Sequence, residues 1–378
     1  MKQKLYYFIC FFLPIKKRIV FESNPEFSCN ALPVYQEMIR RGVDKEYEIY
    51  WLVENKEKYA NDKSGVKYLN YCEKGIWILK TMYILATSKV LIFTNRFLTK
   101  YKKDQLVVNL MHGSPLKKTG DYVEFDTCDY VITQSTFFNR MVSDMLQVPI
   151  QKMIPLGYPR TDILGMRNDS LNALGINENQ KVIVWMPTFR KNRNTGKEYG
   201  FLNSLGVPLL DSVEKFEQLN KRLQECYVLL IIKLHPAEDT SNMTLNDYSN
   251  IFFLSNGDLD DKDVTVYGLL AESDALITDY SSVYYDYLLK DKPIGLVIDD
   301  LEDYGRRNGF VYGEYKDFVK GTYIEKLEDF FEFVYNIGHD LDPDREERQW
   351  AIERYCEHKD FRSTNRVVDF IMEKLKQK

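Results

Sequence analysis

The chain has 378 residues, of which 44% are hydrophobic and 28% are charged. This is the composition of a folded globular protein, and the length allows two domains that each bury a core. A formal net charge of −5 argues against a general nucleic-acid binder, because such proteins usually carry a basic surface. The six cysteines lie far apart with no metal-binding spacing, so we expect free thiols in a reducing compartment.

The first apolar segment, residues 5–15, is followed by three cations at residues 16–18. Its eleven residues would rise only about 16 Å as a helix, against roughly 30 Å of membrane hydrocarbon, so it does not span a bilayer. The cations also stand where a signal peptide would need small residues for cleavage. Two interpretations stay open: the segment lies in the interface of an anionic membrane, or it packs on the domain as a first helix.

From residue 18 onward, short apolar strands alternate with amphipathic helices. The predicted strands are residues 18–22, 47–53, 90–94, 105–111, 130–133 and 152–156. The predicted helices between them are residues 31–41, 74–88 and 135–146. Such alternation is typical of a parallel, doubly wound sheet.

The same alternation restarts after the Gly-Tyr-Pro-Arg turn at residues 157–160. The second set of predicted strands is residues 181–186, 227–234, 251–254, 275–278 and 293–298. The second set of predicted helices is residues 211–225, 264–272, 281–290, 324–335, 345–356 and 361–376. We therefore predict an α/β protein with two Rossmann-like, doubly wound domains, residues 1–160 and 161–378, whose carboxyl edges face a cleft.

The most informative stretch is residues 275–290, ALITDYSSVYYDYLLK. It reads as a buried strand, a tight polar turn and a helix, with Asp279 or Ser281 suited to cap the helix. The turn would leave backbone N–H groups at the carboxyl edge of the sheet, where Ser281, Ser282 and the helix dipole favour an anion such as phosphate. The alternative is an ordinary capped helix with no ligand.

A histidine follows a predicted strand of the first domain. His112 begins the run His-Gly-Ser-Pro-Leu-Lys-Lys, which ends at Lys118 and includes Lys117. At the end of a strand, before a Gly-Ser-Pro turn, an imidazole is placed to act as a base near neutral pH. The alternative is a histidine that only bonds the backbone of its turn.

Two strands of the second domain also end in polar side chains. The strand at residues 181–186 runs into Thr188 and Arg190, and the strand at residues 227–234 contains Lys233 near its end and precedes His235. With the turn at residues 279–282, these side chains form a donor set that suits a diphosphate. Neither a G-x-G-x-x-G nor a Walker pattern occurs. The acidic pair Asp258-x-Asp260, in the run GDLDDKD at residues 257–263, is predicted to lie in a solvated loop rather than to form a metal site.

In this order and spacing, the motifs HGSPLKK, PTFR, KLHP and ITDYSSVYYDYLLKDKP resemble those of the CDP-glycerol glycerophosphotransferases. Further matches are RIVFES at residues 18–23, GYPRTD at residues 157–162, and the region around Arg366. The resemblance covers nearly the whole chain and implies the two-Rossmann architecture of B-type glycosyltransferases, with the nucleotide held by the second domain. The chain departs from the family at Cys29, Asn308 and Phe361, which bears on the donor polyol and the acceptor more than on the reaction type.

By this resemblance, an acceptor hydroxyl attacks the β-phosphorus of a CDP-polyol and CMP leaves. His112 and His235 are then the catalytic candidates, His112 as general base and His235 beside the phosphates. The substrate-binding candidates are Lys117, Thr188, Arg190, Lys233, Asp279, Ser281 and Ser282. These residues require no metal, and no cofactor is expected.

The resemblance implies CDP-glycerol as donor, a lipid-linked glycan or teichoic acid as acceptor, and a cytoplasmic protein at the inner face of the cell membrane. The first domain would then face the membrane and the acceptor. Three alternatives stay open: a CDP-ribitol transferase, a B-type glycosyltransferase or epimerase acting on a nucleotide sugar, and a membrane scaffold without activity. Neither the acceptor nor the oligomeric state follows from the sequence.

Overall fold

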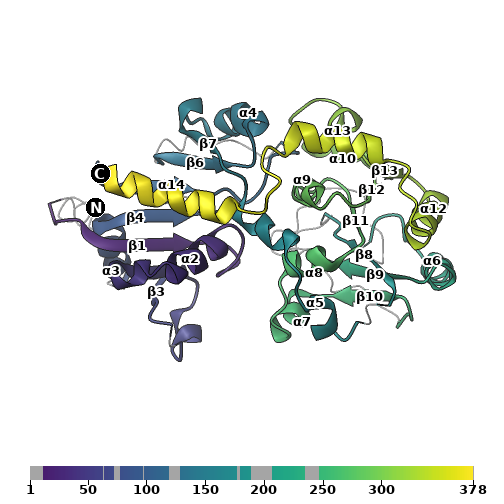
Figure 1. The fold of residues 1–378 in the computed structure, drawn as a ribbon, viewed down its shortest axis with the longest axis horizontal. Coiled ribbons are helices and arrows are strands. Elements are labelled where there is room, and N and C mark those ends of the chain that lie inside the picture. The colour runs from purple at the N-terminus through teal and green to yellow at the C-terminus, as the bar shows by residue number, and fades with distance from the viewer. Residues whose placement is uncertain are drawn as a thin grey trace. The chain divides into compact units, whose positions relative to one another are not determined.

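The computed structural model describes residues 12–62, 64–71, 77–96, 98–118, 128–176, 179–188, 207–234 and 247–377. The chain forms two compact α/β units (Figure 1). Unit 1 comprises residues 1–114, 121–162 and 360–378, and unit 2 comprises residues 115–120 and 163–359. Both sheets are parallel, which confirms the predicted α/β class.

The sheet of unit 1 has seven strands within the described residues, in the order β3-β2-β1-β4-β5-β6-β7. They are β1 (Lys16–Glu22), β2 (Glu48–Val53), β3 (Lys67–Asn70), β4 (Ser88–Phe93), β5 (Leu106–Asn109), β6 (Tyr130–Thr133) and β7 (Met153–Pro155). The edge strand β3 was not predicted, because its four residues, Lys-Tyr-Leu-Asn, show no apolar run.

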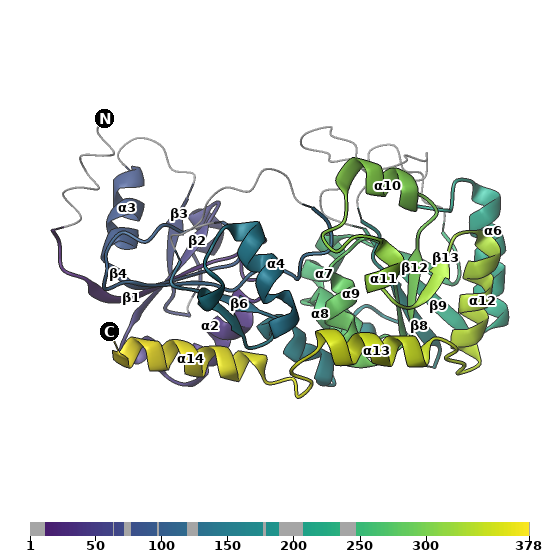
Figure 2. The same cartoon turned by 90° about the horizontal axis from the view of Figure 1, so that it is seen from above.

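Helices cover both faces of this sheet. They are α2 (Ala31–Arg40), α3 (Trp77–Thr87), α4 (Thr136–Leu146) and α14 (Ser363–Gln377). Helices α2 and α14 lie side by side on one face, and α3 lies on the other (Figure 2). Their apolar stripes repeat at helical spacing, as Ala31, Val34 and Met38 do on α2, and these side chains are fully buried in the core of the unit.

The last helix, α14, belongs to unit 1 rather than to the second domain, which differs from the predicted division into residues 1–160 and 161–378. Asp162 accepts hydrogen bonds from the first backbone N–H groups of this helix, at Ser363 (2.9 Å) and Thr364 (2.7 Å). Arg366 Nε donates to the carbonyl of Leu156 (3.0 Å). Asp162 and Ser363 are 201 residues apart, and a contact between such distant residues leaves no local pattern in the sequence. The packing of α14 on unit 1 was therefore not predictable from hydrophobic periodicity.

The sheet of unit 2 has six strands within the described residues, in the order β10-β9-β8-β11-β12-β13. They are β8 (Lys181–Trp185), β9 (Val228–Lys233), β10 (Ile251–Leu254), β11 (Ala275–Thr278), β12 (Ile294–Val297) and β13 (Thr322–Ile324). The predicted strands at residues 251–254 and 275–278 are confirmed with the same bounds, whereas the three-residue edge strand β13 was missed.

The helices of unit 2 are α5 (Ser170–Ala173), α6 (Val213–Glu225), α7 (Asn256–Asp261), α8 (Val266–Glu272), α9 (Val283–Tyr287), α10 (Leu301–Asn308), α11 (Tyr315–Phe318), α12 (Leu327–Gly338) and α13 (Arg345–Tyr355). The loop predicted for residues 257–263 is wrong over most of its length, because Ser255 and Asp258 form a capping box that starts α7 there. The helix predicted at residues 281–290 is shorter, since α9 ends at Tyr287 and a 3₁₀ turn, Leu288–Lys290, follows.

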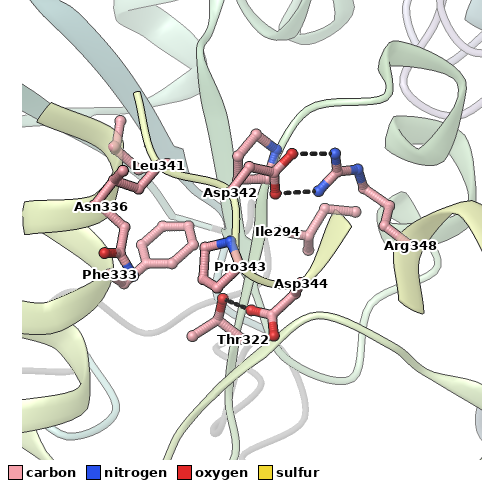
Figure 3. A pocket seen from close by; sticks show the side chains of 11 residues that line it. Ile294, Thr322, Phe333, Asn336, Leu341, Asp342, Pro343, Asp344 and Arg348 are labelled. Atoms are coloured by element: carbon pink, nitrogen blue, oxygen red, sulfur yellow. Dashed lines mark hydrogen bonds and ion pairs between the residues drawn. The ribbon is translucent and has the colours of Figure 1, made fainter. Parts of the chain in front are cut away.

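A buried arginine anchors α13 at the amino ends of β12 and β13 (Figure 3). Arg348 is 2% exposed and pairs through its guanidinium with Asp342 (2.8 Å) and Asp291 (3.0 Å). The pocket beside it has a volume of about 10 Å³, enough for about one water molecule. This pocket is therefore structural, and it lies at the edge of the sheet opposite to the strand ends that carry the sequence motifs.

No helix in the described part of the chain combines the length and the apolar character that crossing a membrane would require.

Candidate functional site

Three adjacent strands of unit 1 bring Glu22, Thr94 and His112 to the same edge of the sheet. Strand β1 ends at Glu22, Thr94 follows β4, and His112 lies just after β5. Strands β1 and β4 pair in register at these ends, as do β4 and β5. His112 keeps a solvent-exposed surface, so the imidazole at this carboxyl edge is open to a ligand.

The backbone that carries His112 is fixed by a fully buried asparagine. Asn30 Nδ2 donates to the carbonyls of Leu110 (3.0 Å) and Met111 (2.9 Å), and its Oδ1 accepts from the backbone N–H of Arg160 (3.1 Å). The Arg160 guanidinium donates in turn to the carbonyl of His112. Residues from two distant stretches of the chain, Asn30 and Arg160, therefore hold the backbone of one histidine in place.

The surroundings of His112 favour its neutral form. Burial by the surrounding protein and then the positive charge of Arg160 lower the pKa of the imidazole below its ordinary value of 6.5. A hydrogen bond to the backbone carbonyl of Thr94 opposes this shift. His112 thus keeps an exposed surface although protein surrounds it. A neutral imidazole near pH 7 can accept a proton.

Asn30 and Arg160 were missed as site residues in the sequence. Both lie in stretches that the family resemblance had marked, Cys29-Asn30 and the GYPRTD motif at residues 157–162. The position of GYPRTD directly after β7 was the signal that could have identified Arg160, because it places the motif at the same sheet edge as His112.

In unit 2, the two candidates Thr188 and Asp279 bond to each other. The Thr188 backbone N–H donates to both carboxylate oxygens of Asp279 (3.0 Å each), and its hydroxyl donates to one of them (2.5 Å). Asp279 is fully buried. These hydrogen bonds join the residues that follow β8 and β11. The Asp279 carboxylate therefore stabilises the two turns, and we do not expect it to bind a ligand directly.

The turn after β11 brings Ser281 and Ser282 to a half-buried position. Ser282 is the N-cap of α9 without a side-chain hydrogen bond, which corrects the prediction that Asp279 or Ser281 would be the cap. Ser281 Oγ instead accepts from the N–H of Val283 at 3.4 Å. Both hydroxyls remain at the carboxyl edge of the sheet, where the sequence placed them.

An aromatic cluster supports this turn from behind. The Tyr280 ring stacks on Tyr304 with a centroid distance of 3.9 Å, and the Tyr315 hydroxyl donates to the carbonyl of Asp279 (2.6 Å). Lys117, which packs within unit 2 and forms a β-bridge with Phe310, places its Nζ 3.4 Å from the Tyr304 hydroxyl. Lys117 is thus held against the cluster that shapes the turn.

The last residue of β9, Lys233, is a buried cation. Its side chain is 3% exposed, and its Nζ donates to the carbonyl of Leu234 (2.8 Å). Burial lowers the pKa of Lys233 to about 8, while Asp258 and Asp260 raise it in part. A buried ammonium at the carboxyl edge of a parallel sheet would be stabilised by an anionic ligand.

The candidates Arg190 and His235 lie outside the described residues. Within the described part of the chain, no group of three or more histidine, cysteine, aspartate or glutamate residues could hold a metal ion.

The model of one family matches residues 5–373, and its description is CDP-glycerol:poly(glycerophosphate) glycerophosphotransferase. The chain belongs to this family. The resemblance inferred from the ordered motifs is therefore confirmed over nearly the whole chain.

Curated relatives of the glycerophosphotransferase family differ in the polyol they are named for. The teichoic acid poly(glycerol phosphate) polymerase of Bacillus spizizenii is 27% identical over 85% of this chain and 83% of its own length. The teichoic acid ribitol-phosphate primase of the same organism is 28% identical over 77% and 76%. The ribitol-phosphate polymerase TarL of Staphylococcus aureus is 25% identical over 92% of this chain but only 60% of its own length.

Solved structures agree with the fold. The wall teichoic acid polymerase TagF matches with a TM-score of 0.78 at 20% identity, over 100% of this chain and 93% of that one. A UDP-N-acetylglucosamine 2-epimerase matches with a TM-score of 0.52 at 10% identity, over 97% and 98%. These likenesses support the architecture of two Rossmann-like units.

Proposed function

We propose that this protein transfers a polyol phosphate unit from a CDP-polyol, with CDP-glycerol as the first candidate, to a hydroxyl of a teichoic acid or lipid-linked glycan acceptor. The acceptor oxygen attacks the β-phosphorus, and a new P–O bond forms. The bond between the β-phosphorus and the bridging oxygen breaks, so CMP leaves. The acceptor proton passes to a base, for which the neutral, exposed imidazole of His112 is suited.

The observation that carries this proposal is the way His112 is held. Asn30 bonds the carbonyls of Leu110 and Met111 just before it, the Arg160 guanidinium bonds its own carbonyl, and burial and Arg160 lower the pKa of its imidazole. A histidine that only bonds the backbone of its own turn would not require these contacts. A base fixed at one sheet edge fits an attack that depends mainly on positioning.

On the donor side we assign the diphosphate to unit 2. Lys233 supplies a buried cation at the end of β9, and Ser281 and Ser282 supply hydroxyls after β11, on the other side of β8 in the same sheet. Thr188 and Asp279 fix the turns that carry these groups. Lys117, Arg190 and His235 complete the proposed donor site from their positions in the family motifs.

CDP-ribitol is the alternative donor, since relatives named for ribitol phosphate match this chain about as well as those named for glycerol phosphate. Incubation with CDP-glycerol, CDP-ribitol and UDP-sugars, each with a teichoic acid acceptor, would separate these cases. We expect CMP release with one CDP-polyol and no UDP release. Release of UDP, or of no nucleotide at all, would contradict the proposal.

We also propose peripheral association with the inner face of the cell membrane. Phe12 is 70% exposed, and Lys16 and Lys17 follow it on the surface. An exposed aromatic side chain beside cations suits an anionic bilayer. Removing residues 1–15 should weaken sedimentation with anionic liposomes, and unchanged sedimentation would place the membrane contact elsewhere.

A further inference from the structure

A buried serine at the carboxyl edge of unit 1 has no part in the reaction proposed above. Ser135 lies two residues after the end of β6 and is the N-cap of α4, a helix of 11 residues. It is 2% exposed, and its hydroxyl has no hydrogen-bond partner within the described residues. Burying a hydroxyl without a partner costs free energy, and a ligand that bonds the hydroxyl would offset this cost.

The hydroxyl of Ser135 lies at the positive end of α4. The backbone of Ser135 is extended (φ −158°, ψ 167°), which is the usual N-cap conformation and directs the side chain toward the start of the helix. The hydroxyl nonetheless accepts no hydrogen bond from the described backbone of α4. The first turn, residues 136–139, contains no acidic side chain that would balance the helix dipole. Thr136 is exposed, so this end of α4 is open to a ligand.

The start of α4 lies beside the segment that carries His112. Strands β5 and β6 pair in parallel, so His112, which follows β5, and Ser135, which follows β6, lie at the same edge of the sheet. Ser114 Oγ donates a hydrogen bond to Gln134 Oε1 (2.6 Å), and both residues are buried. This bond joins the turn after His112 to the residue that precedes Ser135.

We propose that the Ser135 hydroxyl and the amino end of α4 form a subsite for a phosphodiester of the acceptor. A helix N-terminus and a hydroxyl donor both favour a phosphate oxygen. The diphosphate of the donor is assigned to unit 2, so the anion left for unit 1 is the phosphodiester one polyol away from the attacking hydroxyl. This subsite rests on the proposed function, in which His112 is the base toward that hydroxyl. It favours an acceptor that already carries polyol phosphate over a neutral glycan.

The first test compares two acceptors that differ only in charge. The probes are a trimer of glycerol phosphate and the same trimer with each phosphodiester methylated to a neutral triester. Ser135→Ala removes one donor to phosphate, so we expect its affinity for the charged trimer, measured by calorimetry, to fall on the order of tenfold. Its affinity for the neutral trimer should stay within about twofold of the wild type. Unchanged affinity for the charged trimer, or an equal loss for both trimers, would overturn the proposal.

Ser143→Ala is the matched control on the same helix. Ser143 is also buried, but its hydroxyl donates to the carbonyl of Val148 (2.6 Å) near the carboxyl end of α4. We expect Ser143→Ala to lower the midpoint of denaturant unfolding and to keep the affinity for both trimers. Ser135→Ala breaks no hydrogen bond of the described residues, so it should keep the unfolding midpoint. A lower midpoint with unchanged trimer affinity in Ser135→Ala would show that Ser135 only stabilises the helix.

Ser135→Asp places a carboxylate where the phosphodiester is proposed to bind. Aspartate is a favourable N-cap, so this variant should fold and unfold at or above the midpoint of the wild type. It should bind the charged trimer at least as weakly as Ser135→Ala does, while its affinity for the CDP-polyol stays within about twofold of the wild type. If either variant instead loses affinity for the CDP-polyol and keeps its affinity for the charged trimer, the anion bound here belongs to the donor and the proposal is wrong.

The subsite and the proposed function fail separately. If a CDP-polyol releases CMP and His112→Ala loses turnover, while Ser135→Ala keeps its affinity for the charged trimer, the proposed function stands and the subsite is wrong. If no donor releases its nucleotide but binding of the charged trimer depends on Ser135, the subsite stands and the proposed reaction is wrong.

Discussion

Arg160 contacts both His112 and Cys29, a position at which this chain differs from its family. The Arg160 guanidinium contacts Cys29 Sγ at 3.3 Å as well as the carbonyl of His112. In the motif resemblance that identified the family, Cys29-Asn30 stands where Asp-Asn is usual. A thiol brings no formal negative charge to Arg160, so its positive charge acts more strongly on the imidazole.

Cys29→Asp should therefore move the pH dependence of turnover. A carboxylate beside Arg160 offsets its charge and raises the pKa of His112, because an added negative charge favours the imidazolium. The acidic limb of kcat/KM, which reports the free enzyme, should lie below pH 6.5 in the wild type and shift to higher pH in the variant. The neutral isostere Cys29→Asn serves as control. An equal shift in both variants would show that shape rather than charge matters.

Burial of Lys233 leads to a second prediction, on how the stability of the protein depends on pH. The Lys233 pKa of about 8 in the folded state lies below its ordinary value of 10.5, so between these pH values the unfolded chain binds more protons. Stability must then rise with pH across this window, by about 3 kcal/mol from this group. Lys233→Met should be more stable than the wild type at pH 7, and the difference should vanish toward pH 10.5.

The same substitution should weaken donor binding. Loss of a charge-assisted contact to phosphate is expected to reduce CDP-polyol affinity by about 10- to 100-fold, measured by calorimetry. Lys290→Met is the matched control, because burial also lowers the pKa of Lys290 and its Nζ likewise bonds a backbone carbonyl, that of Ala271, but Lys290 lies in the 3₁₀ turn after α9 rather than at the end of a strand. Unchanged affinity in Lys233→Met, or an equal loss in Lys290→Met, would remove Lys233 from the donor site.

At the scale of elements, the docking of α14 depends on a close approach at Gly157. This residue has φ +80°, and a Cβ added there would overlap Ser363 Oγ at the start of the helix. Ser363 also accepts a hydrogen bond from the Arg366 guanidinium (3.0 Å). The GYPRTD motif thus contributes Gly157 and Asp162 to the docking of α14, and Arg160 to the His112 site.

Gly157→Ala tests this contact, and Gly175→Ala is its control. Gly175 has nearly the same φ of +76° but no atom within 4 Å of an added Cβ. Backbone strain of at least about 1 kcal/mol is therefore common to both variants, and only Gly157→Ala adds a clash of about 1–3 kcal/mol. Denaturant unfolding should show the larger loss in Gly157→Ala, and Ser363→Ala should restore part of it. Equal losses of stability in Gly157→Ala and Gly175→Ala would mean that the start of α14 moves to accept the added Cβ at no cost in free energy.

The sequence predicted the helices and strands whose bounds depend on a local pattern of apolar and turn residues. Strands β6, β10 and β11 have the predicted bounds because each is a short apolar run between turn residues. Strands β3 and β13 were missed because edge strands of three or four residues carry little apolar signal. Helix α7 was missed because its six residues are dominated by glycine and aspartate, and its capping box outweighs that poor propensity.

At the scale of the whole molecule, the sequence predicted two α/β units and the strand ends that carry His112, Lys233 and the turn at residues 279–282. It did not predict which residues hold them. Asn30 and Arg160 meet at His112 from positions 130 residues apart, and Asp162 meets α14 across 201 residues. Such contacts depend on the folded chain, so they follow from no local pattern.

The proposed reaction is the transfer of a polyol phosphate to a hydroxyl. The most direct measurement is the product formed by the full chain from a CDP-polyol and a short teichoic acid acceptor, analysed by mass spectrometry and phosphorus NMR together with CMP release. The account predicts that each CMP released is matched by one new phosphodiester and one added polyol phosphate on the acceptor, and that His112→Ala lowers both together by roughly 100-fold. CMP release without growth of the acceptor, or growth by a sugar from a UDP-sugar donor, would contradict it.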